Sequence, residues 1–144
     1  MVLEPPEAAL LTGRETFRRT GLTVRQFWQW AFSDLRANIV RGVLAEFLVA
    51  KAVGDPAVVR GAWGNYDVDR PAADATIRVE VKSAAYLQSW RQRRLSRIVF
   101  SGLTGRPWDE VEGYGPDREI RADVFVFAIQ TAESHDVYDL LDVD

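Results

Sequence analysis

The first part of the chain has the apolar spacing of helices. Between residues 24 and 35 apolar side chains recur every three or four positions, and Thr23 directly before them is a suitable N-cap. We predict an amphipathic helix packed on a core. A second helix is predicted at residues 39–53, ended by Gly54, and a short one at residues 14–19.

After the second helix the apolar period shortens to two, which is typical of strands. In residues 76–84 the odd positions from 77 to 81 are apolar and the even positions from 78 to 82 are charged. The predicted strands are residues 57–63, 66–69, 76–84, 97–102 and 122–130. A helical turn or two is expected in residues 85–94 and a Gly- and Pro-rich loop in 101–119. This order predicts an α/β fold with a central mixed sheet flanked by helices.

Composition narrows the kinds of site that the chain can build. The 144 residues contain no cysteine and one histidine, His135, so thiolate and multi-imidazole metal sites are excluded. A metal would therefore be held by oxygen ligands. No apolar run approaches the length of a membrane span, and the start lacks the features of a secretion signal, so we expect a cytoplasmic protein.

Charge is distributed unevenly along the chain. The segment 131–144 holds five acidic residues and no lysine or arginine; removing them from the net charge of −3 leaves +2 for residues 1–132. The basic residues of the sequence RQRRLSR are Arg91, Arg93, Arg94 and Arg97. They are candidates for binding the phosphates of a nucleic acid, with a solvated basic face as the alternative.

A hairpin formed by two of the predicted strands would gather charged side chains. If Asp67 lies opposite Glu80, then Asp69 lies opposite Arg78, and all four share the polar face with Lys82. Like charges directly opposite destabilise a sheet, so one carboxyl is protonated or a cation lies between the two. Two carboxylates with backbone carbonyls and waters suit Mg²⁺ or Mn²⁺.

Glu46 is a further acidic candidate on the second predicted helix. At 100° per residue its neighbours on the helix are apolar, whereas Arg41 and Lys51 fall on the opposite side. A carboxylate on such a face needs a hydrogen bond, a proton or a cation. The alternative to a metal is a backbone amide or an arginine from another segment.

Lysine is rare in this sequence, where Lys51 and Lys82 are the only two. An arginine stays charged at every accessible pH, but a lysine amine can be deprotonated and can orient or activate a water molecule beside a metal. The alternative is that Lys82 forms only an ion pair, with Asp67 or with Glu80.

The combination of these features resembles the PD-(D/E)XK nuclease superfamily, which has the restriction-endonuclease-like fold. The matching stretches are RGVLAEFLVA with Glu46, NYDV with Asp67, and VEVKSA with Glu80 and Lys82, within residues 38–130. The resemblance implies that Asp67 and Glu80 bind Mg²⁺ or Mn²⁺, that Glu46 completes the metal shell, and that Lys82 activates water. The layout is most similar to Holliday-junction resolvases and small restriction-type nucleases.

The sequence departs from the family pattern in places. Tyr66 stands before Asp67 where the family has proline, and Asp69 or Asp74 becomes the metal ligand if the register differs. Gln88, six residues after the lysine, is similar to a glutamine that some members place on the following helix, where it would face the nucleic acid.

The expected protein is a single nuclease-like domain over residues 1–144, made of a helical extension (1–37), a core (38–130) and an acidic tail (131–144). The expected activity is Mg²⁺-dependent cleavage of DNA by an endonuclease, with a homodimer or a partner protein adding specificity. The alternative is an inactive nuclease-like domain that binds nucleic acid or protein.

Overall fold

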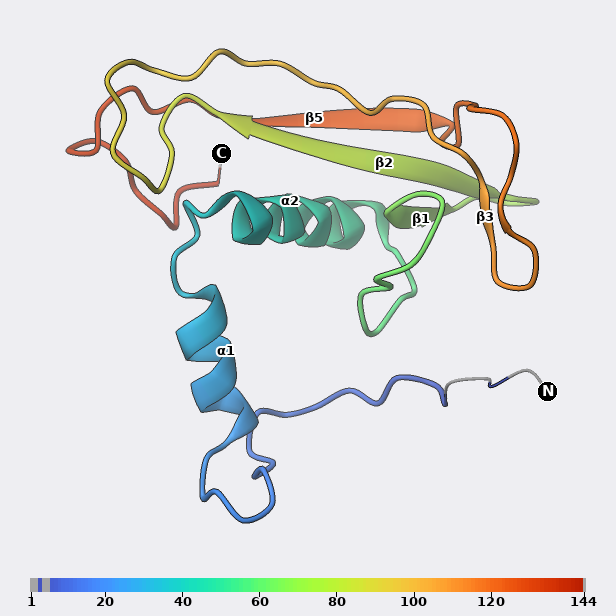
Figure 1. The fold of residues 1–144 in the computed structure, drawn as a ribbon, viewed down its shortest axis with the longest axis horizontal. Helices are drawn as coiled ribbons and strands as arrows, with labels where there is room; N and C mark the ends of the chain where they lie inside the picture. The colour runs from blue at the N-terminus through green and yellow to red at the C-terminus, as the bar shows by residue number, and fades with distance from the viewer. Residues whose placement is uncertain (1–2, 4–5, 144) are drawn as a thin grey trace.

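The computed structural model describes residues 3 and 6–143 of the chain (Figure 1). Its elements are α1 (Val24–Phe32), α2 (Asn38–Val53), β1 (Val68–Pro71), β2 (Thr76–Ala85), β3 (Trp108–Asp109), β4 (Gly113–Tyr114) and β5 (Val124–Gln130). The strands β1, β2 and β5 form one sheet in that order, with β1 antiparallel and β5 parallel to β2. The predicted α/β class with a mixed sheet is confirmed. Neither described helix has the length and apolar content that a membrane crossing requires.

The core lies between α2 and one face of this sheet. Ala45 of α2 packs with Val68 of β1 and with Val79 and Val81 of β2, and all four are buried. The side chains that alternate with these valines along β2 therefore point to the other face, as predicted. Gly54, at φ 75°, takes the left-handed conformation that ends α2.

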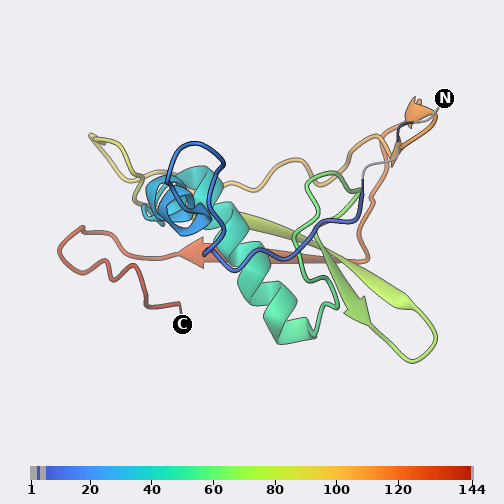
Figure 2. The ribbon, with the colours of Figure 1, turned by 90° about the horizontal axis from the view of Figure 1, so that it is seen from below.

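The sheet is covered less completely than predicted. Only α2 packs on it among the described helices, crossing the strands at an angle (Figure 2). The helix α1 begins with the expected cap, since Thr23 and Gln26 form a capping box, but it projects away from the sheet (Figure 1). Its Trp30 is 86% exposed and Val24 is its one buried residue, so the prediction that this helix packs on the core is wrong.

The predicted helix at residues 14–19 is absent. These residues form one side of a closed loop, in which Val24 N–H donates to Glu15 O, Phe17 N–H donates to Leu22 O, and Thr16 bridges to Thr23. So short a segment gains too few helical hydrogen bonds to offset nucleation, and pairing across the loop satisfies its backbone instead.

Two predicted strands also fail to form, because no described strand pairs with them. Residues 57–63 are an exposed loop beside β1, the edge strand of the sheet. Residues 97–102 run above the sheet without pairing (Figure 1), and the Phe100 ring packs on that of Phe127 in β5 at 4.5 Å between centroids. Ala85 is the last residue of β2, and residues 86–94 form bends and irregular structure rather than helical turns. The predicted loop 101–119 contains the small β3–β4 hairpin.

Candidate functional site

The hairpin of β1 and β2 has the predicted register. Asp69 lies opposite Arg78 and Val68 opposite Val79. Asp67, one residue before β1, donates its N–H to Val79 O at 3.1 Å, although Val79 is the register partner of Val68. Asp67 and Val68 thus both face Val79, as in a β-bulge, and Asp67 is not directly opposite Glu80 as predicted.

The carboxylate of Asp67 is the centre of the predicted cluster. Its Oδ2 accepts a hydrogen bond from Val81 N–H at 2.7 Å, in place of the backbone carbonyl that a longer β1 would supply. Burial raises the pKa of Asp67; the Val81 bond lowers it, the carboxylates of Glu80 and Glu46 raise it further, and the Lys82 ammonium lowers it. The charges of all three other predicted site residues therefore affect the pKa of Asp67.

Glu80 and Lys82 neutralise each other on the face of β2 opposite the core. Lys82 Nζ donates to Glu80 Oε1, and the Glu80 residue is 9% exposed. Glu80 also lines a crevice, too narrow for a water molecule, with Asn65, Arg121 and Phe125. The ion pair expected as the alternative role of Lys82 is therefore present, and it is formed within one strand.

Glu46 pairs with an arginine from another segment, as in the alternative that the sequence left open, although the sequence did not identify which arginine. Arg60, in the loop between α2 and β1, donates from Nε to Glu46 Oε2 and from Nη2 to Oε1, the second at 2.9 Å. The Glu46 side chain is 15% exposed, so this fork satisfies a carboxylate that is mostly withdrawn from water. In the sequence, the one feature that sets Arg60 apart is that it is the single cation in the apolar stretch AVVRGAW, whose pattern predicts a strand.

The carboxylates of Asp67, Glu80 and Glu46 provide only part of the oxygen ligands that a divalent cation needs. In the described chain, Asp67 Oδ1 and Glu80 Oε2 have no hydrogen-bond partner, and two such carboxylate oxygens, one just before β1 and one on β2, are of the type that binds Mg²⁺ or Mn²⁺. The third carboxylate, Glu46, is held by Arg60 through both oxygens. Accordingly, no group of three His, Cys, Asp or Glu side chains among the described residues is arranged to hold a metal ion.

The alternative ligands Asp69 and Asp74 lie elsewhere. Asp69 Oδ1 is buried without a hydrogen-bond partner, and Asp69 raises the pKa of Tyr66 through a hydrogen bond with its hydroxyl. Asp74 is exposed in the turn between β1 and β2. Neither forms a hydrogen bond with Glu46 or Glu80, whose side-chain partners in the described chain are Arg60 and Lys82, so the choice of Asp67 as ligand stays a prediction.

The segment after β2 differs from the expectation for a nucleic-acid surface at one position. Gln88 is 7% exposed and gives its Nε2 to Ala85 O and Ser96 Oγ, while its N–H donates to Gln92 Oε1. The prediction that Gln88 faces nucleic acid is wrong, because its amide is used to anchor the loop to the end of β2. The four basic residues of the segment are all exposed: Arg91, Arg93, Arg94 and Arg97.

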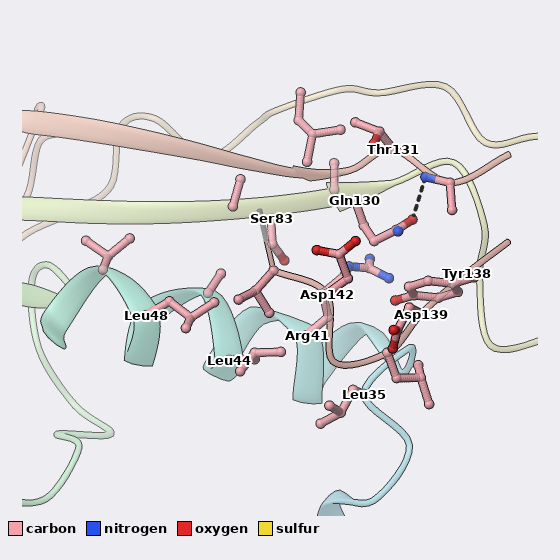
Figure 3. Close-up of a pocket in the computed structure, with 18 of the residues that line it drawn as sticks. Leu35, Arg41, Leu44, Leu48, Ser83, Gln130, Thr131, Tyr138, Asp139 and Asp142 are labelled. Atoms are coloured by element: carbon pink, nitrogen blue, oxygen red, sulfur yellow. Dashed lines mark hydrogen bonds between the residues drawn. The ribbon is translucent and has the colours of Figure 1, made fainter. Parts of the chain in front are cut away.

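A separate pocket of about 450 Å³ lies between α2, β5 and the tail (Figure 3). Leu44 and Leu48 contribute apolar walls, and Arg41, Tyr138 and Asp139 contribute polar groups. The Arg41 Nε is buried without a hydrogen-bond partner, and burial lowers the Arg41 pKa. None of the predicted catalytic residues lines this pocket.

Comparison with known proteins adds no relative: no family model, no curated protein and no solved structure matches this chain.

Proposed function

We propose that this chain is a metal-dependent nuclease with a restriction-endonuclease-like fold, which hydrolyses phosphodiester bonds of DNA. The observation that carries the proposal is the position of the Asp67 carboxylate: its Oδ2 accepts a hydrogen bond from Val81 N–H, the residue between Glu80 and Lys82, which pair with each other. A purely structural role gains nothing from placing the Asp67 carboxylate near that of Glu80, since neighbouring like charges on paired strands are destabilising. Charge clusters of this kind are common at catalytic sites.

Each residue has a definite task in this proposal. Asp67 and Glu80 would hold Mg²⁺ or Mn²⁺ through their unbonded oxygens, and Glu46 would add a third carboxylate. The bound ion supplies a Lewis acid that polarises phosphate and acidifies water. Lys82, once its Nζ leaves Glu80, orients a water molecule or takes its proton.

Substrate binding is assigned to the exposed basic segment that follows β2. Its four arginines lie within 15 residues of Lys82 in the sequence and form no ion pair with an acid of the described chain: Arg91, Arg93, Arg94 and Arg97. Guanidinium groups bind phosphate in a bidentate manner and give affinity without base readout. Sequence or structure specificity would then come from a second copy of the chain or from a partner protein.

A second candidate function has support from the ion pairs. Glu46 is already paired with Arg60 and Glu80 with Lys82, which is the arrangement expected of a nuclease-like domain that binds nucleic acid or protein without cutting it. In that case the charged residues stabilise the fold and the arginines alone carry the function.

Cleavage of supercoiled and branched DNA in Mg²⁺, Mn²⁺ or EDTA separates the two candidates. The test compares the parent with Asp67→Asn and with Asp74→Asn, which removes an exposed acid in the β1–β2 turn. We expect metal-dependent nicking by the parent and by Asp74→Asn and none by Asp67→Asn. Cutting that survives EDTA or the Asp67 change would overturn the mechanism. Salt-sensitive DNA binding without cutting in either metal would establish the second candidate.

A further inference from the structure

Arg60 binds Glu46, the third carboxylate of the proposed metal site, and so keeps it from a metal ion. It grips both oxygens of Glu46, and the Glu46 and Asp67 carboxylates both act on its guanidinium. It therefore lies where a cation interacts with two of the three acids at once. A divalent ion shared by those acids would lie in the same electrostatic environment.

The segment that carries Arg60 is poorly attached to the rest of the fold. All eight residues 57–64 are exposed, and the segment forms neither helix nor strand. The Arg60 side chain is 44% exposed, against 15% for that of Glu46. Arg60 can therefore leave by movement of its own loop and side chain, while Glu46 stays fixed on α2.

The charges of the cluster explain why a divalent ion that binds Glu46 would displace Arg60. The acids Glu46, Asp67 and Glu80 face two cations, Arg60 and Lys82, so the cluster carries one uncompensated negative charge. A divalent ion added to this set would lie close to two fixed positive charges. Release of Arg60 removes one of these positive charges. It also frees the two carboxylate oxygens of Glu46, which are hard ligands of the type that Mg²⁺ and Mn²⁺ bind.

We propose that Arg60 is a tethered competitor of the metal ion: it holds Glu46 in the metal-free protein, and a divalent cation must displace it to gain Glu46 as a ligand. The inference rests on the proposed metal site at Asp67 and Glu80. Arg60 is a positioning residue in this scheme, since it acts through Glu46. The competition lowers metal affinity and reduces the repulsion among the carboxylates when no metal is bound.

Mn²⁺ titration followed by electron paramagnetic resonance of the free ion tests the competition directly. We expect Arg60→Gln to bind Mn²⁺ about tenfold more tightly than the parent, a factor that corresponds to about 1.4 kcal/mol. Arg60→Lys, which keeps the charge and loses the fork, should give an intermediate affinity. Arg36→Gln, which breaks an exposed arginine–aspartate pair with Asp34, is the matched control and should leave the affinity unchanged.

The effect must pass through Glu46. In a Glu46→Gln background, Arg60→Gln should no longer tighten Mn²⁺ binding, because the shared carboxylate is gone. An affinity that falls or stays constant in Arg60→Gln, while Mn²⁺ still binds the parent and is lost in Asp67→Asn, overturns the role of Arg60 alone. Absence of Mn²⁺ binding from both the parent and Arg60→Gln overturns this role and the proposed metal site together. Thermal unfolding of each variant confirms that the folded protein is being titrated.

Discussion

Replacing Lys82 by methionine removes the ammonium group that pairs with Glu80 and keeps an aliphatic stem of similar length. The Glu80 residue is 9% exposed, so its carboxylate would lose a cation that water can replace only in part. It would also remain near Asp67, whose pKa is already raised by burial and by the charges of Glu80 and Glu46. The substitution therefore tests whether this cluster is held together by balanced charge.

The size of the effect follows from the burial of the pair. Removing one partner of a fully buried ion pair costs about 3–5 kcal/mol, whereas exposed pairs are worth about 0.2–1 kcal/mol. The side chains here are 27% exposed for Lys82 and 12% for Glu80, which lies between these limits. We expect Lys82→Met to lower the free energy of unfolding by about 1–3 kcal/mol at pH 7.

Urea unfolding monitored by tryptophan fluorescence measures this loss, and the chain offers a matched control. Lys51, the other lysine, is exposed in the last turn of α2, and its Nζ lies 5.6 Å from the centre of the Phe47 ring. Lys51→Met should cost less than about 0.5 kcal/mol. The double variant Glu80→Gln, Lys82→Met should be more stable than Lys82→Met alone, because no unpaired charge remains.

Lys82→Arg separates stability from catalysis. Arginine can keep the ion pair with Glu80 but does not give up its proton, so we expect near-parent stability together with a loss of DNA cleavage of about 10²–10⁴-fold. Equal stability of Lys82→Met and Lys51→Met, or a double variant no more stable than Lys82→Met, would refute the charge-balance reasoning. Full cleavage by Lys82→Arg would refute proton transfer by this residue.

Three further outcomes are expected. Val79→Ala should cost about 2–3 kcal/mol in urea unfolding, because this side chain is 2% exposed, whereas Val111→Ala, at 80% exposed, should change stability by less than about 0.5 kcal/mol. The pKa of Asp67 in the folded protein lies above its ordinary 3.8, so the folded protein loses stability as pH rises from 3.8 through the folded-state pKa and Asp67 ionises. Asp67→Asn should therefore be more stable than the parent at pH 7, and the difference should shrink toward pH 3.8. Arg94→Gln should weaken DNA binding at every sequence and reduce the slope of log K against log salt by about 1, measured by fluorescence anisotropy.

The apolar periods predicted the parts of the fold that depend on neighbours in sequence. The alternation in residues 76–84 assigned each side chain of β2 to its face, and the register supposed for the hairpin, with Asp69 opposite Arg78, is the one observed within β1. Residues 57–63 had the same strand-like composition and formed no strand, because a strand also requires pairing with a neighbour, which apolar alternation does not specify.

The sequence by itself determined that acids and a lysine share one face of a hairpin, since side-chain direction in a strand repeats every two residues. Only the tertiary structure decided which charges pair. Arg60 reaches Glu46 across 14 residues, and Gln88 is buried because the loop after β2 folds back on it. Such contacts depend on which separate segments come together after the core has closed. Short-range periodicity carries no information about the distance between those segments.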